Sequence, residues 1–327
     1  MRRPSAFTVL QAAVSLGSLA AVVWWATRQE PPSLPDTTGR IAALAGALAV
    51  YALATAVRGE RWHRILRANG VAVERGDSYR LTTVGYMGNN VLPARAGDLM
   101  RALLLGPRTA TPRREILGSV IAERALDAAA LSVVFAAGLA SVQADTGVSR
   151  ARVAVLALAV ATVAAAAALL VLLARHVGAV ERIRLFLRPL ALATRRLAGR
   201  HGARLLVLSL AIWALEASVY LLVGYAAELR LGFPGALYVV GLTNLFALVP
   251  AGPGYVGTFD AAVLLGVRSL GHPGSDAVAY LLLLRFVLFV PITLVGLAFF
   301  LARYRALRDA AGSPEPALAV RRPPSGS

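Results

Sequence analysis

The chain has 327 residues, of which 57% are hydrophobic and 16% are charged, and its net charge is +17. Its apolar residues form long unbroken runs instead of the one-sided stripes of water-soluble helices, which excludes an ordinary soluble globular protein. There is no cysteine, and the four histidines are scattered. The sequence therefore predicts no disulfide framework, no metal site and no bound cofactor.

Six apolar runs are long enough to cross a hydrocarbon core of about 30 Å, which takes about 20 residues of helix. They cover residues 7–26, 41–57, 116–140, 151–174, 205–226 and 277–302. The first run ends without a small-residue cleavage site, so it is interpreted as a retained helix and not as a signal peptide. No segment alternates with the period of a strand, and an all-α polytopic membrane protein is predicted.

Arginines predict the orientation in the membrane, because positively charged loops stay in the cytoplasm. Residues 58–80 contain six arginines and residues 175–204 contain eight, whereas the loops at 27–40 and 141–152 contain two each. Arginines also flank both ends of the chain. The pattern predicts cytoplasmic N- and C-termini in the plasma membrane, and in so apolar a chain it favours a topology signal over nucleic-acid binding.

Two segments, 79–105 and 236–267, interrupt the apolar pattern with proline and glycine. A single crossing by either would place arginine-rich loops outside, so each segment must enter and return. An arm of about 12 residues spans only about 18 Å as a helix, which favours two re-entrant hairpins. Pairs of short crossings remain an alternative, as does a simple kink in a spanning helix.

The two interrupted segments resemble one another in "NNVLPARAGDLMRALLLG" and "TNLFALVPAGPGYVGTFDAAVLLG". Each has an Asn, a Pro-Ala-x-x-Gly break and then an acid. We therefore predict an inverted repeat with units 41–140 and 205–302, linked by 141–204, after an N-terminal helix and external loop (1–40) and before a disordered cytoplasmic tail (303–327). Broken helices in opposed repeats predict a substrate site near the membrane midplane. The candidate residues at the breaks and nearby are Asn89, Asn90, Pro93, Gly97, Glu216, Asn244, Pro250, Gly254 and Gly257.

Several charged residues lie inside the apolar segments, where each costs at least about 2.5 kcal/mol. Glu123 and Asp127 share a helix face, from which Arg124 is expected to turn away. That face is expected to pair with Arg95 or Arg101.

Asp260 and Glu216 are the expected partners of Arg285. Arg95 lies beside a helix N-terminus and is a candidate phosphate ligand. The alternative is that these charges are ion pairs that fix the packing and bind no ligand.

At these residues the chain resembles the lysylphosphatidylglycerol synthase transmembrane-domain family, which includes the flippase half of the bacterial multiple peptide resistance factor. The resemblance covers roughly residues 41–302 and rests on "NNVLPARAGDLMRALLL", "ERALD", "PAGPGYVGTFDAAVLL" and Arg285. Members often have Glu in place of Asp98 and Asp260. The resemblance implies movement of anionic or aminoacylated lipids between leaflets, along a route lined by Arg95, Asp98, Arg101, Glu123, Arg124, Asp127, Asp260 and Arg285.

Three functions are compatible with this sequence. The first is a lipid flippase or transporter for phospholipids or lipid-linked substrates. The second is a non-catalytic partner that presents such a lipid to a separate glycosyl- or aminoacyl-transferase. The third is an intramembrane enzyme that uses Glu123 and Asp127 as paired carboxylates. The tail after Arg305 is about 20 residues long and cannot form a soluble aminoacyl-transferase domain, so no enzymatic activity is expected from that source.

Overall fold

The computed structural model describes residues 35–92, 95–109, 111–146, 200–247, 252–272 and 274–312, together with six isolated positions between Gly17 and Arg28. Over these ranges the chain is helical and contains no strand. The predicted runs 7–26 and 151–174 lie largely or wholly outside the described residues, as do the two proline positions of the predicted breaks, Pro93 and Pro250.

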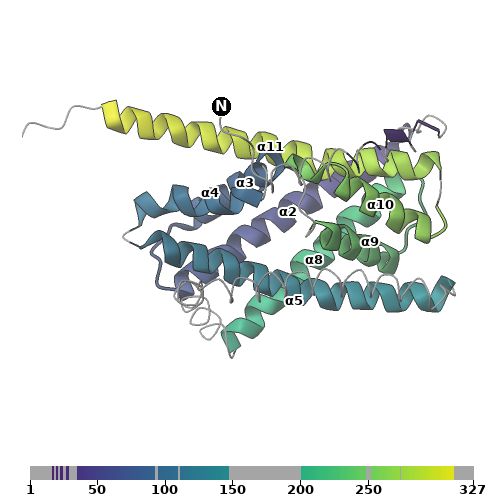
Figure 1. The fold of residues 1–327 in the computed structure, drawn as a ribbon, viewed down its shortest axis with the longest axis horizontal. Coiled ribbons are helices and arrows are strands. Elements are labelled where there is room, and N and C mark those ends of the chain that lie inside the picture. Colours follow the sequence, from purple (N-terminus) through teal and green to yellow (C-terminus); the bar gives the residue numbers. More distant parts are fainter. Residues whose placement is uncertain are drawn as a thin grey trace, which may run out of the picture.

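The described helices form two consecutive groups on either side of the undescribed segment 147–199 (Figure 1). The first group comprises α2 (Thr38–Ala68), α3 (Arg75–Val91), α4 (Ala96–Leu105), the 3-10 helix η2 (Gly106–Arg108) and α5 (Arg113–Thr146). The second comprises α8 (Arg200–Ala226), α9 (Phe233–Phe246), the 3-10 helix η3 (Pro253–Tyr255), α10 (Thr258–Ser269) and α11 (Ser275–Gly312).

Three described helices are long and apolar enough to cross a membrane: α2, α8 and the segment Ser275–Ala302 of α11. They coincide with the predicted runs 41–57, 205–226 and 277–302, and they confirm an all-helical membrane protein. The run 116–140 lies within α5, a helix of 34 residues with charged side chains in its first half. Helix α11 extends beyond the predicted run, to Gly312.

Helix α2 continues well past the predicted end at residue 57 because its buried face continues. Ala43, Ala47, Tyr51 and Ala54 are buried at intervals of three and four residues, and Arg58, Arg61 and Ile65 extend the same face. Two arginines on this apolar face require buried anionic partners, which other helices supply.

The packing pairs helices from the two groups. In Figure 1, α11 runs along one edge of the molecule and α5 along the opposite edge, with α2 and α8 crossing between them. Helix α2 packs along α8, α3 packs on α11, and α9 packs on α5. Each group therefore places its second helix against the last helix of the other group.

Glycines permit two of these contacts. A Cβ atom at Gly138 of α5 would lie 2.6 Å from the backbone nitrogen of Tyr238 in α9. A Cβ atom at Gly296 of α11 would lie 2.5 Å from the Cβ of Met87 in α3. Both crossings bring helix backbones closer than any larger residue allows, as is common between membrane helices.

We expect Gly138→Leu and Gly296→Leu each to lower the melting temperature of the detergent-solubilised protein, because overpacking a tight contact costs about 1–3 kcal/mol. The control is Gly118→Leu in α5, where a Cβ atom meets nothing within 4 Å. Equal melting temperatures for the Gly118 and Gly138 variants would show that the α5–α9 crossing is looser than described.

Candidate functional site

Both predicted breaks separate two helices. Helix α3 ends at Val91, and α4 begins after Arg95, whose backbone is left-handed with φ of 55°. In the second segment, α9 ends at Phe246 and α10 begins after Gly257, with φ of 86°. A left-handed arginine is unfavourable without a compensating contact, so the conformation of Arg95 suggests that its side chain is held in place.

The two breaks lie against one another. Arg95 donates a hydrogen bond from Nε to the Tyr255 hydroxyl over 2.7 Å, and its guanidinium lies 5.5 Å from the centre of that ring. The carbonyl oxygen of Asn90 lies 3.4 Å from where a Cβ atom of Gly254 would be. Among the residues that the structure describes, Arg95 forms no direct ion pair, although its charge acts on the nearby Asp98 carboxylate. A half-buried cation is thus available between the two helix groups.

Six charged side chains beside the first break form a closed ring of alternating sign, hereafter the charge ring. Its members, in order around the ring, are Arg61, Glu123, Arg101, Asp98, Arg124 and Asp127. The N···O distances between successive members are 3.0, 3.0, 3.0, 3.0, 3.2 and 2.6 Å. Each charge therefore contacts two charges of opposite sign, and the ring joins α2, α4 and α5.

The charge ring has a buried side and an accessible side. The side chains of Arg61, Arg101 and Glu123 are at most 1% exposed. Those of Asp98, Asp127 and Arg124 are 17%, 13% and 28% exposed. The second set is therefore the more exposed half of the ring.

Further contacts stabilise the buried side of the ring. Arg61 also donates to the Ser209 hydroxyl over 2.7 Å, and the Arg101 guanidinium lies 4.8 Å from the centre of the Trp62 ring. Gly85 makes room for Arg101, since a Cβ there would lie 2.6 Å from the arginine Cγ. Balanced charge and added hydrogen bonds are what offsets the desolvation of buried ions.

A second, smaller cluster lies at the other break. Arg285 forms an ion pair with Asp260 and also donates to the carbonyl oxygen of Gly254 over 3.3 Å. Its guanidinium lies 5.3 and 5.0 Å from the ring centres of Phe259 and Phe289. Asp260 in turn accepts a 2.8 Å hydrogen bond from the backbone nitrogen of Gly257, which caps the N-terminus of α10.

The structure confirms two of the predicted pairings, Arg101 with Glu123 and Arg285 with Asp260. Two other expectations were wrong. Arg124 does not turn away from the acidic face, since it reaches forward three residues to Asp127. Of the two arginines expected as alternative partners of that face, Arg101 meets it, whereas Arg95 bonds to Tyr255. Glu216 does not meet Arg285 but pairs with Arg58 over 2.6 Å, which joins α8 to α2.

Some of the remaining predicted site residues make contacts at the breaks, and one bonds within its own helix. Asn89 donates to Asp98 over 3.4 Å, and Asn90 donates to Thr293 of α11 over 3.0 Å. Gly97 lies where α4 meets α3. Asn244, by contrast, bonds to the carbonyl oxygen of Val240 in its own helix.

Sequence reasoning missed Arg58, Arg61, Ser209 and Tyr255. Arg58 and Arg61 were counted only as cytoplasmic charges. Their spacing could have revealed a buried position, because Arg58 and Arg61 follow Tyr51 and Ala54 at the same three- and four-residue intervals along α2.

An all-helical chain with membrane-length apolar helices and buried ion pairs between them is an integral membrane protein. More specifically, the chain belongs to the lysylphosphatidylglycerol synthase transmembrane-region family, whose model matches residues 8–296.

A curated relative is the glycosyltransferase AglD of Haloferax volcanii, which is 34% identical over 101 residues. The match covers 31% of this chain, and the chain spans only 15% of the length of that relative. No solved structure matches the chain. Membership of this family indicates a membrane function connected with lipids.

Proposed function

We propose that this protein is a flippase or transporter that moves the headgroups of anionic, aminoacylated or lipid-linked lipids between the leaflets of the plasma membrane. The observation that carries the proposal is the position of Arg95, a half-buried arginine without a carboxylate partner among the described residues, where the two broken segments meet. A guanidinium presents a planar set of donors that suits phosphate oxygens.

The accessible side of the charge ring provides the complementary chemistry. Asp98 lies at the start of α4, three residues after Arg95, and is 17% exposed. In the proposed mechanism the lipid phosphate binds Arg95, a cationic headgroup such as an aminoacyl amine meets Asp98 or Asp127, and the acyl chains remain in the bilayer. Tyr255 holds Arg95 in position until the phosphate replaces it as the hydrogen-bond partner.

We further propose that the two helix groups are inverted repeats, with two re-entrant hairpins and cytoplasmic termini. Three correspondences support this. The packing of α3 on α11 matches that of α9 on α5. Asp98 and Asp260 each occupy the third position of the helix after the break, and they pair with Arg124 and Arg285 of the following long helix.

Gly138 and Gly296, at the crossings of these long helices, are the third correspondence. Opposed repeats around broken helices allow alternating access by rocking of one repeat against the other.

The test is leaflet exchange of fluorescent phosphatidylglycerol and lysyl-phosphatidylglycerol in liposomes, followed by dithionite quenching. We expect wild-type protein to accelerate exchange and Arg95→Gln to slow it by roughly 10- to 100-fold, since a hydrogen bond to a charged group contributes about 1.5–3 kcal/mol. Tyr255→Phe should retain exchange with a smaller loss. The control is Arg230→Gln, an exposed arginine remote from the breaks in sequence.

Exchange that survives in Arg95→Gln would contradict the phosphate role of Arg95 and leave the charges as packing elements. Absence of exchange in folded wild-type protein for every lipid tested would contradict transport itself.

The match to a glycosyltransferase favours one alternative, a membrane partner that presents a lipid-linked substrate to a separate transferase. This alternative predicts no exchange, together with a transferase that gains activity when the protein is added. The ion pairs of Glu123 and Asp127 with arginines favour a packing or binding role for these carboxylates over acid–base catalysis.

A further inference from the structure

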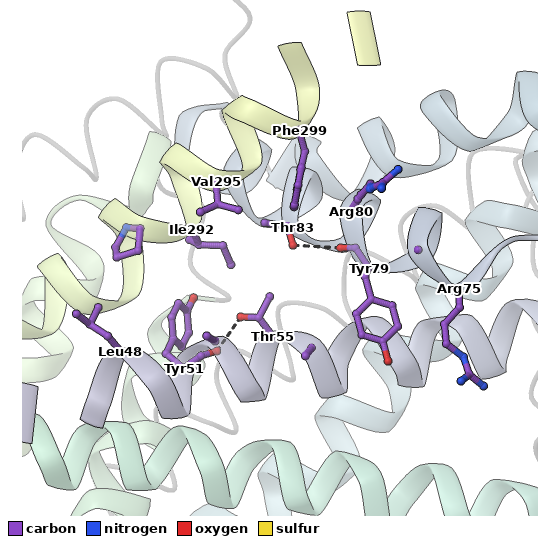
Figure 2. Close-up of a pocket in the computed structure, with 14 residues that line it drawn as sticks. Leu48, Tyr51, Thr55, Arg75, Tyr79, Arg80, Thr83, Ile292, Val295 and Phe299 are labelled. Carbon is purple, nitrogen blue, oxygen red and sulfur yellow. Dashed lines mark hydrogen bonds between the residues drawn. The ribbon is translucent and has the colours of Figure 1, made fainter. Parts of the chain in front are cut away.

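A cavity of about 770 Å³ lies between α2, α3 and α11 (Figure 2), and no residue of the charge ring lines it. Its volume falls in the range of about 300–1,000 Å³ that is usual for small-molecule sites. Leu48, Ile292, Val295 and Phe299 supply much of its apolar lining. From Leu48 to Ala56 along α2 the cavity follows about 12 Å of helix, at 1.5 Å per residue.

One end of this cavity is cationic. Figure 2 shows Arg75, Tyr79 and Arg80 at the end opposite Leu48 and Ile292. Both arginine side chains are exposed, and Arg80 has no carboxylate partner among the described residues. Arg75 begins α3, so the unpaired backbone N–H groups of the first helical turn lie at the same end.

The acids near this end do not pair with Arg80. Glu60 accepts hydrogen bonds from Arg64 over 2.9 Å and from Tyr79 over 3.0 Å, and its carboxylate lies 3.4 Å from Arg75 Nε, so it partly neutralises Arg75. Asp77 accepts two hydrogen bonds from Arg108, at 3.0 and 2.8 Å. Arg80 therefore carries the unneutralised positive charge of this end.

The cavity opens toward the outer surface of the helices, where a membrane would lie. Val295 and Phe299 are 46% and 37% exposed, and Leu53 on the adjoining face of α2 is 54% exposed. The arginine-rich segment 58–80 predicts that the cationic end is at the cytoplasmic surface. An apolar channel that opens sideways and ends in arginines at the headgroup level complements a molecule with a hydrocarbon chain and an anionic head.

We propose that this cavity is a binding site for an anionic phospholipid of the cytoplasmic leaflet. One acyl chain lies along α2 and α11, between Leu48 and Phe299, and the phosphate contacts Arg75 and Arg80. The inference deepens the proposed function by placing an anionic lipid on the cytoplasmic side, but binding here does not require transport through the breaks.

The test is lipid binding to the purified full-length protein in detergent, measured by native mass spectrometry with phosphatidylglycerol and phosphatidylcholine of the same acyl chains. We expect a preference for phosphatidylglycerol that the double variant Arg75→Gln/Arg80→Gln lowers by about tenfold or more, since each basic side chain at an anionic headgroup contributes about 1 kcal/mol. The control is Arg67→Gln, an exposed arginine of α2 that does not line the cavity.

A second variant tests the acyl chain. Ala52→Trp narrows the cavity from an exposed position of α2 and should reduce the binding of both lipids alike. A phosphatidylglycerol with a photoreactive group on its acyl chain should label peptides of α2 and α11 in wild-type protein and lose this labelling in Ala52→Trp.

Three results would overturn the proposal. They are equal binding of the two lipids, labelling confined to other helices, and a dimer whose second copy protects α2 and α11 from the photolipid. Leaflet exchange that fails while this binding persists would contradict transport and leave the site standing. Leaflet exchange that persists when this binding is absent would contradict the lipid site and leave transport standing.

Discussion

Replacing Arg61 with methionine should destabilise the protein by about 3–5 kcal/mol, because the change leaves buried carboxylates without their cation. Arg61 contacts Glu123 over 3.0 Å and Asp127 over 2.6 Å, and its side chain is 0% exposed. After the substitution Glu123 retains Arg101 and Asp127 retains Arg124, but the ring has one negative charge in excess. The measurement is the unfolding transition in mixed detergent micelles.

Two further variants separate charge balance from packing. Arg61→Met/Glu123→Met removes one cation and one anion and leaves the neutral chain Arg101–Asp98–Arg124–Asp127, so it should be more stable than the single variant. Arg64 lies one turn further along α2 and forms an ion pair with Glu60, and its side chain is 46% exposed. The control Arg64→Met should therefore change stability by no more than about 1 kcal/mol. A double variant less stable than Arg61→Met would contradict the ring as a unit of charge balance.

Gly97→Ala is expected to be the most damaging single-atom change in the first broken segment. A Cβ atom at Gly97 would overlap the carbonyl oxygen of Gly85 and lie 2.5 Å from the backbone nitrogen of Asn89. These are backbone atoms of α3, which cannot rotate away, so α4 would have to move and carry Asp98 and Arg101 with it. We expect a loss of about 3 kcal/mol or more in stability, at the upper end for overpacking.

The matched control is Gly46→Ala in α2, where the nearest atom to an added Cβ is a Leu222 methyl at 3.7 Å. That variant should be neutral or slightly stabilising, since alanine is favoured over glycine within a helix. Leaflet exchange provides a second readout, because displacement of α4 also displaces Arg95. A folded Gly97→Ala variant of wild-type stability would show that α3 and α4 are further apart than described.

The sequence was informative where local chemistry determines the structure. Proline and glycine located both interruptions, and the third-position acids Asp98 and Asp260 marked the helices that follow. Glu123 and Asp127, four residues apart, were correctly expected to share a helix face, although the arginine that contacts both is Arg61. These features depend on the order of residues along one helix, which a single sequence contains.

Partners across the fold could not be read from the sequence. Arg61 and Asp127 are far apart in the chain, and which arginine meets which acid depends on how α2, α4 and α5 pack. Arg58 and Arg61 were further obscured because an arginine at the end of an apolar run is usually a topology signal. Tyr255 is uncharged, so the search for charged residues inside the apolar segments did not find it, although it accepts a hydrogen bond from Arg95 across the junction of the two breaks.

The charge ring also determines which parts of the molecule can move. Because three helices share one closed set of ion pairs, separating any two of them would expose several charges at once, so we expect α2, α4 and α5 to move as one rigid body. Further polar contacts, Arg58 with Glu216 and Arg61 with Ser209, fix α2 to α8. Across the junction of the breaks, Arg95 and Tyr255 share a single hydrogen bond. If the two halves rock against one another, α2 and α8 are therefore the expected hinge axis, and the junction of the breaks is the part expected to open.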